Sequence, residues 1–268
     1  AAALVQPEEY DGVFSGGPRP QVDAAVLDGT GLEEEGCVTG ASSSEVLWCQ
    51  VVEGKPGGKR VVLAGGSHDV QWYQALRGVA LEEGWELIVV GKNGCRLSMP
   101  DPDHNLTDLC WDWNPSALEQ IISLEPDAVF SLGTVTQPAG RPEVVHQGQI
   151  EYWEELAEAG IPVVALRDNP RFEWRVPGCL ETATDPSECG VDRSVAYPGE
   201  IPTAVLETPG VYFIDTANWF CDQSRCEPIV GNVVVYRDQG HFTATYATSM
   251  TPYLLEALEI GAPFLFMK

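Results

Sequence analysis

The chain has 268 residues, of which 15 are Lys or Arg and 40 are Asp or Glu, giving a formal net charge of −25. This length is enough for one domain with a full-sized hydrophobic core and a smaller extension. No apolar run approaches the ~20 residues that a helix needs to cross a bilayer. Such a negative charge repels polyanions, so the sequence predicts no nucleic-acid partner and excludes binding to anionic lipid by charge.

Residues 1–35 are rich in Gly, Pro, Ala and acidic residues and show no sustained periodicity. They are predicted to be a leader or linker extension, followed by one α/β domain over residues 36–268. Because the chain begins at Ala1 rather than Met, we expect either a mature protein or a domain of a longer polypeptide.

The eight cysteines are even in number and fall in closely spaced couples. Pairing of neighbours is one of many possible connectivities, and the short loops favour it. The expected disulfides are Cys37–Cys49, Cys95–Cys110, Cys179–Cys189 and Cys221–Cys226. They indicate an oxidising compartment, either periplasmic or at the cell surface. The absence of a Cys-x-x-Cys spacing and the scattered histidines predict no metal site.

From Arg60 onward, apolar runs of strand length alternate with helical patterns. This alternation predicts βα units in a three-layer α/β/α sandwich with a mainly parallel, flavodoxin-like sheet. The predicted strands are Arg60–Ala64, Glu86–Val90, Asp127–Leu132, Ile161–Leu166, Val211–Ile214 and Val233–Tyr236. The predicted helices are Val70–Glu83, Ser116–Ser123 with Pro115 near its start, Gln149–Ala159 and Thr243–Ile260. Reactive groups of such sheets collect in loops after the strands, here the loops that begin at Gly65, Gly91 and Arg237.

Ser67 follows two glycines at the end of the first of these strands, in the stretch "VVLAGGSHDVQW". A hydroxyl placed at a helix N-terminus is suited to acyl transfer, because the helix end stabilises a developing oxyanion. The alternative is that Ser67 only caps the helix. The stretch lacks the glycine spacing and Lys of a phosphate-binding loop, so no nucleotide cofactor is expected.

Asp238 and His241 are three residues apart in "YRDQGHFTATYA", between the last predicted strand and the final helix. A carboxylate that accepts from one imidazole nitrogen leaves the other nitrogen to take a serine proton. The alternative is a surface Asp and a loop His with no relation to Ser67. A doubly wound sheet brings the last loop beside the first, which favours a Ser67, His241 and Asp238 site.

The order of these motifs resembles the SGNH hydrolase superfamily, and more narrowly the extracytoplasmic SGNH domain fused to membrane-embedded acyltransferase-3 proteins. The matching stretches are "GGSHDVQW", Lys92-x-x-Cys95, "RDNP" at 167–170, "CDQSRC" and "VYRDQGHFT". The resemblance implies Ser67 as nucleophile, His241 as general base and then acid, and Asp238 as the orienting carboxylate. It also implies a membrane-embedded acyltransferase domain as acyl donor, in the same chain or a complex, and a carbohydrate or glycolipid acceptor.

Two positions depart from the superfamily pattern. Gly66 stands where the serine block usually carries Asp, which removes a carboxylate that braces the turn, and the Gly-x-Asn-Asp block is absent after the third strand, in "SLGTVTQP". The resemblance then leaves the oxyanion hole to the Ser67 backbone N–H and an amide within residues 92–94, with Gly94 as the candidate. Gly133 and Thr134 are further candidates.

Several other residues have two readings each. Arg167 and Asn169 are expected either to line the acceptor cleft or to form a buried salt bridge that holds the 179–189 loop. His68 is either a second base or, as its position beside Ser67 favours, structural. Five tryptophans are either platforms for sugar rings or core residues: Trp111, Trp113, Trp153, Trp174 and Trp219.

The function expected from these observations is an extracytoplasmic serine-dependent O-acyltransferase, with acetyl as the expected acyl group. It would modify a cell-surface glycan or glycolipid hydroxyl and be tethered to the membrane. Two alternatives stay open. A secreted carbohydrate O-acetyl esterase would use the same three residues, and a catalytically degenerate glycan-binding module would fit the loss of Asp at position 66.

Overall fold

The structure, a computed structural model, describes residues 17–101 and 106–267. Its strands are β1 (Val38–Thr39), β2 (Trp48–Val52), β3 (Arg60–Gly65), β4 (Glu86–Lys92), β5 (Ala128–Leu132), β6 (Val163–Leu166), β7 (Val191–Asp192), β8 (Val211–Ile214), β9 (Arg225–Cys226), β10 (Ile229–Val230) and β11 (Val233–Val234). Its α-helices are α1 (Val22–Ala25), α2 (Ser67–Val70), α3 (Tyr73–Glu83), α4 (Asp108–Ser123), α5 (Gln147–Glu158), α6 (Val176–Leu180), α7 (Arg193–Ala196), α8 (Thr203–Glu207), α9 (Ala217–Phe220), α10 (Ala244–Ser249) and α11 (Thr251–Gly261). Short 3₁₀ helices cover Pro186–Cys189 and Pro263–Phe266.

The central sheet contains seven strands in the described part of the chain, with the path β1-β4-β3-β5-β6-β8. Strand β2 pairs antiparallel with β4, and every other pair in this sheet is parallel. The order reverses at β3, since β4 lies on one side of it and β5 on the other. Ligands of open α/β sheets bind beyond the carboxyl ends of the strands at such a reversal, and the chain places the turn before Ser67 there.

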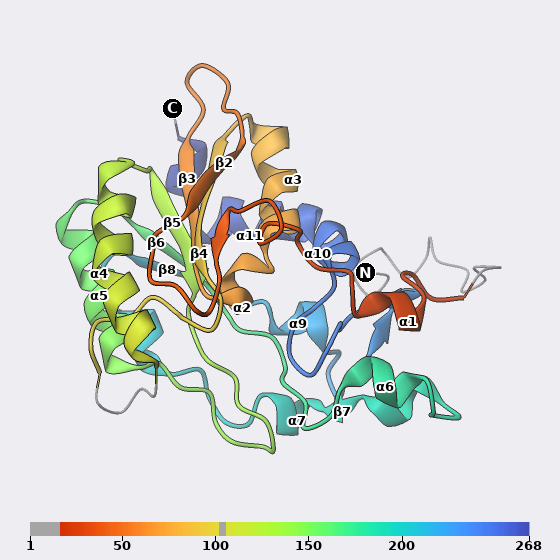
Figure 1. Cartoon of the computed structure of the whole chain (residues 1–268). Coiled ribbons are helices and arrows are strands. Elements are labelled where there is room, and N and C mark those ends of the chain that lie inside the picture. The colour runs from red at the N-terminus through yellow and green to blue at the C-terminus, as the bar shows by residue number, and fades with distance from the viewer. Residues whose placement is uncertain (1–16, 102–105, 268) are drawn as a thin grey trace.

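Each face of the sheet carries its own hydrophobic core. Along β3, Val61 and Leu63 belong to the core that includes α3, α10 and α11, whereas Val62 and Ala64 belong to the core that includes α4 and α5. The two groups of helices lie on opposite sides of the sheet (Figure 1). Since strands buried on both faces need apolar residues at every position, the continuous apolar runs identified them, and the predicted three-layer α/β/α fold is confirmed.

One predicted strand lies outside the central sheet, and two predicted helices differ from the structure. The predicted helix Thr243–Ile260 is two helices, α10 and α11. The stretch 233–236 does not join the central sheet: β11 pairs antiparallel with β10, and Tyr236 forms an isolated bridge with Phe242. An apolar run shows burial but not which partner covers it. Pro115 lies inside α4 rather than near its start, because the helix already begins at Asp108.

Residues 17–35 of the predicted leader pack against the domain, whereas residues 1–16 lie outside the described residues. Ala25 and Leu32 are fully buried, and Asp28 accepts hydrogen bonds from the backbone N–H groups of Ala244 and Thr245. None of the helices in the described residues has the length and apolar character needed to cross a bilayer.

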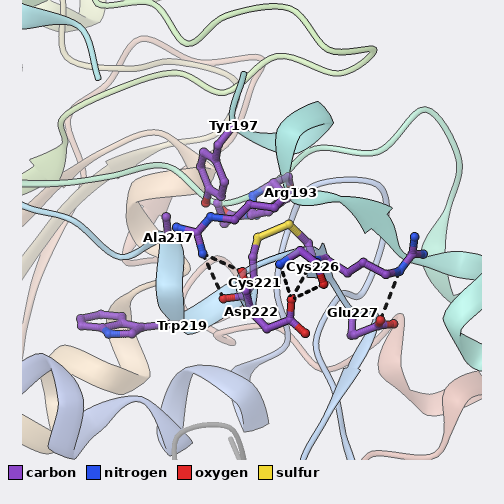
Figure 2. The surroundings of a disulfide bond; sticks show 12 residues. Arg193, Tyr197, Ala217, Trp219, Cys221, Asp222, Cys226 and Glu227 are labelled. Carbon is purple, nitrogen blue, oxygen red and sulfur yellow. Dashed lines mark hydrogen bonds and ion pairs between the residues drawn. A yellow bond between two sulfur atoms is a disulfide. The ribbon is translucent and has the colours of Figure 1, made fainter. Parts of the chain in front are cut away.

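All eight cysteines lie in the described residues and form the four expected disulfides between neighbours, so that prediction is confirmed. Figure 2 shows the Cys221–Cys226 bond, which closes a loop around Asp222. One Asp222 carboxylate oxygen accepts from the backbone N–H groups of Ser224 and Arg225, at 2.6 and 2.7 Å. The Arg193 guanidinium donates to the Asp222 carbonyl from outside the loop at 2.8 Å. The short loop is therefore fixed by both a covalent bond and polar contacts.

Candidate active site

The turn between β3 and α2 presents Ser67 at the first position of the helix. Gly66 precedes it as the N-cap, in an extended conformation that any residue can adopt. Glycine is required here for a different reason, because a Cβ at this position would lie 1.6 Å from the carbonyl oxygen of Cys95. The loop after β4 therefore leaves no space for the Asp that the superfamily pattern carries at position 66.

Another carboxylate, that of Asp69, braces the serine turn in this chain. Its Oδ2 accepts from the backbone N–H of Gly66 at 2.7 Å, and its Oδ1 accepts from the Ser131 hydroxyl and the Leu132 backbone N–H at 2.8 and 2.7 Å. Burial raises the pKa of Asp69 to about 6, although these hydrogen bonds oppose the rise. Sequence reasoning missed this residue. The available signal was an Asp two residues after the serine, in the first turn of the helix.

Ser67, His241 and Asp238 form one hydrogen-bonded chain. The Ser67 Oγ lies 2.8 Å from His241 Nε2, and His241 Nδ1 lies 2.8 Å from Asp238 Oδ2. Because a carboxylate only accepts, the His241 proton belongs on Nδ1, which leaves Nε2 to accept from the serine hydroxyl. Burial acts to raise the pKa of Asp238, but the hydrogen bonds and charge of His241 outweigh it and hold the pKa below its ordinary value.

A tight hairpin carries Asp238 and His241. Its ends are joined by the Tyr236–Phe242 bridge and by the hydrogen bond from Arg237 N–H to the His241 carbonyl. Inside it, Asp238 Oδ1 accepts from the backbone N–H groups of Gly240 and His241, at 2.8 and 2.7 Å. The pair is thus held in place by its own backbone before any contact with Ser67.

Asn169 and Gln71 connect this hairpin to the serine helix. The Asn169 amide donates to the Gly240 carbonyl at 2.6 Å, and its carbonyl accepts from the Gln71 amide at 2.8 Å. The other end of Gln71 accepts from the Phe242 backbone N–H at 2.9 Å. Asn169 is fully buried, so it orients the site from behind and does not line the cavity in which the expected acceptor would bind.

A second imidazole, His68, packs beside the first. Its ring centroid lies 4.3 Å from that of His241, and its Nδ1 lies 3.1 Å from Asp168 Oδ1. His68 therefore contacts Asp168 rather than the Ser67 hydroxyl. Burial, with the nearby Arg171 guanidinium, lowers the pKa of His68 to about 4, against the effect of Asp168. A neutral ring beside His241 avoids placing two imidazolium charges in contact.

The expectation that Arg167 lines a cleft is wrong. Its guanidinium forms a buried ion pair with Glu143 and a second ion pair with Asp215, whose side chain is exposed. It also lies 4.5 Å over the ring of Tyr197. The alternative expectation of a buried salt bridge is correct, but its partners are not in the 179–189 loop. The pKa of Arg167 rises above its ordinary value because the contacts with Glu143 and Asp215 outweigh the effect of burial.

Gly133 and Thr134, the further candidates for the oxyanion hole, do not line the Ser67 cavity. The Gly133 backbone N–H donates to the Leu166 carbonyl at 2.6 Å, and the Thr134 hydroxyl donates to Glu143 at 2.8 Å. Both residues follow β5 directly; β6 accepts the Gly133 N–H, and Glu143, which lies outside the strands, accepts the Thr134 hydroxyl. The sequence cannot show this competition, since it depends on the register between β5 and β6.

Ser67 and Gly94 keep backbone N–H groups that find no acceptor within residues 17–101 and 106–267. Both residues line a cavity of about 690 Å³ that also contains His241, Asp238, His68 and Arg171. Lys92 anchors the Gly94 loop from behind: its buried ammonium donates to the carbonyls of Gly40 and Ser43 at 3.0 and 2.5 Å. The cavity thus holds the Ser67 hydroxyl, hydrogen-bonded to His241, together with the backbone amides of Ser67 and Gly94.

The tryptophans divide between core and surface. Trp113 and Trp153 are fully buried in the core beside α4 and α5, so neither can stack on a sugar. Trp174 stays partly exposed, and Trp219 lines a separate hollow of about 230 Å³ near the Cys221–Cys226 loop. None of these four lines the Ser67 cavity.

The chain is similar to a solved structure titled the periplasmic domain of a lipopolysaccharide acetyltransferase of Salmonella ser. Paratyphi A. The TM-score is 0.55 at 14% sequence identity, over 92% of this chain and 94% of that one. At this identity the likeness shows a common fold. No curated protein matches the chain by sequence. The family described as "SGNH domain (fused to AT3 domains)" matches residues 35–256, which is most of the chain. The chain therefore belongs to the family of SGNH domains that occur fused to acyltransferase-3 domains.

Proposed function

We propose that this chain is an extracytoplasmic serine-dependent O-acyltransferase domain that transfers an acyl group, in the first instance acetyl, to a hydroxyl of a cell-surface glycan or glycolipid. The observation that carries the proposal is the continuous hydrogen-bonded chain from Ser67 through His241 to Asp238. The family supports it, since these domains occur beside membrane acyltransferase domains. The disulfides and the periplasmic origin of the structural neighbour support a location outside the cytoplasm.

Acyl transfer would proceed in two balanced steps. In the first, the Ser67 Oγ attacks the acyl carbonyl carbon while His241 Nε2 takes its proton, and the same proton passes to the departing oxygen of the donor. In the second, the acceptor hydroxyl gives its proton to His241 and attacks the Ser67 ester, and the proton then returns to Ser67. The amides of Ser67 and Gly94 would stabilise the oxyanion in both steps.

The donor in this proposal is a membrane-embedded acyltransferase domain, in the same polypeptide or a complex. Transfer requires that the acceptor hydroxyl reach the ester before water does. The open cavity of about 690 Å³ has room for a sugar ring against Ser67 and His241.

The test measures release of p-nitrophenol from p-nitrophenyl acetate by the purified domain, with the mass of the acyl-enzyme recorded. Ser67→Ala and His241→Ala should each lower turnover by about 10³-fold or more, whereas Ser116→Ala, an exposed serine on α4, should leave it unchanged. Equal turnover by the Ser67→Ala variant would refute the proposal.

Two further observations separate transfer from its alternatives. An added glycan that gains the acyl group in a Ser67-dependent manner supports the transferase. Release into water alone, with the glycan unmodified, would identify an esterase. A Ser67 that does not react with a fluorophosphonate would identify a binding module.

A further inference from the structure

Ser67 lines two cavities. The first is the cavity of about 690 Å³ that contains His241 and Gly94. The second, of about 530 Å³, is lined by Ser67 together with Arg237, Phe242 and part of the predicted leader, including Val26 and Gly29. The leader residues therefore contribute directly to the surroundings of the candidate nucleophile.

The positions of the candidate catalytic groups assign different roles to the two cavities. A tetrahedral intermediate on Ser67 has three further substituents: the oxyanion, the alcohol oxygen and the carbon chain of the acyl group. The departing and the attacking alcohol oxygens must both meet His241, and the oxyanion must face the free amides. His241 and Gly94 line the first cavity and are not among the residues that line the second. The acyl chain is thus directed to the second cavity.

The second cavity is larger than an acetyl methyl group needs. Three buried apolar residues lie in its wall: Val38, Val70 and Phe242, each no more than 5% exposed. These side chains suit the methylene groups of a longer chain, since apolar surface there is removed from water on binding.

The Arg237 guanidinium is the unexplained charge in this cavity. The side chain is half-buried, and it has no ion pair or side-chain hydrogen bond among residues 17–101 and 106–267. Gly29 makes room for it, because a Cβ there would lie 2.8 Å from Arg237 Nη1. Three glutamates, Glu33, Glu34 and Glu35, contribute to the same wall. All three are exposed, so water screens their charges, and the Glu33 carboxylate accepts from the Asn93 amide at 2.6 Å. A planar guanidinium without a carboxylate partner is a specific binding group for one.

We propose that the second cavity receives the acyl chain of the Ser67 ester and that Arg237 binds a carboxylate at its far end, so that the domain accepts acyl groups of short dicarboxylic acids such as succinyl. This inference rests on the proposed function, in which Ser67 carries the acyl group. The bonds made and broken are those of the acetyl reaction, and the distal carboxylate takes no part in them.

The experiment compares three esters, p-nitrophenyl acetate, butyrate and hemisuccinate, and subtracts the release seen with Ser67→Ala to remove spontaneous hydrolysis. The hemisuccinate should have a higher kcat/KM than the butyrate, whose chain has no carboxylate. Arg237→Gln should lower the hemisuccinate-to-butyrate ratio about tenfold or more, and Arg237→Lys should lower it less. Arg77→Gln, which removes an exposed arginine on α3 outside both cavities, is the matched control and should leave the ratio unchanged.

A ratio that Arg237→Gln leaves unchanged would overturn the carboxylate site even if all three esters react. Loss of the longer esters, with acetate alone accepted, would overturn the acyl assignment of the cavity. The absence of any Ser67-dependent release would instead refute the proposed function. If Arg237→Gln does not fold, Gly29→Ala provides a second test, since its Cβ pushes on the guanidinium and should lower the same ratio.

Discussion

The buried carboxyl group of Asp69 predicts how the stability of the protein depends on pH. The side chain is 2% exposed, and burial raises its pKa from 3.8 to about 6. A group with a raised pKa in the folded state contributes stability that is fully present below pH 3.8 and is lost as the pH rises through about 6. Asp69→Asn places a neutral amide of the same shape at this position and removes the titration.

The size of the effect follows from the pKa shift. The rise of the Asp69 pKa from 3.8 to about 6 corresponds to about 3 kcal/mol in the free energy of unfolding. The wild type should therefore lose up to about 3 kcal/mol relative to Asp69→Asn between pH 4 and pH 7. Superimposed on this trend is a constant loss of about 1–2 kcal/mol in the variant, because an Asn amide cannot accept from all three donors that Asp69 binds.

The assay is urea unfolding of both proteins, followed by tryptophan fluorescence at several pH values from 4 to 7.5. Asp112→Asn, an exposed carboxylate on α4, is the control and should follow the wild type at every pH. A stability difference between the wild type and Asp69→Asn that stays constant over this range would show that Asp69 titrates like an exposed carboxylate, and the reasoning would fail.

Three further outcomes are expected. Asp238→Asn should lower kcat about 10⁴-fold in the ester assay, with the fold unchanged by circular dichroism, because it favours the wrong tautomer of His241; a loss below tenfold would contradict the assigned role. Gly66→Asp should destabilise the protein by about 3 kcal/mol or more in urea, since its Cβ would collide with the Cys95 carbonyl, so restoring the superfamily residue should not raise activity. Asn169→Ala should lower kcat more than it changes KM, because it frees the Gly240 carbonyl from behind the site; a pure KM effect would point to substrate contact instead.

The sequence predicted the sheet well because burial on both faces leaves a strong pattern. Strands β3 to β6 and β8 are nearly continuous apolar runs, and the loops that carry Ser67 and the Asp238–His241 pair follow such runs. The run at 233–236 looks the same in sequence but belongs to a separate hairpin. An apolar run indicates that a segment is buried. Only the three-dimensional structure shows which element packs against it.

The residues that support the candidate site were harder to predict from the sequence than the sheet. Gly133 and Thr134 have suitable donors in isolation, and neighbouring groups consume those donors in the fold. In the sequence, Asp69 looks like any acidic residue in the first turn of a helix. Its three hydrogen-bond donors come from the turn before it and from β5. Contacts between distant segments decide both cases, and a single sequence carries no record of them.

The closeness of Gly66 to Cys95 has an evolutionary consequence. Cys95 is fixed in place by its disulfide to Cys110, so its carbonyl cannot move away from the serine turn without disturbing that bond. A relative with Asp at the position of Gly66 must route the loop after β4 along another path. Residue 66, the loop over residues 93–96 and the cysteine couple should therefore change together among relatives, with the bracing carboxylate moving to the position of Asp69 wherever the glycine is found.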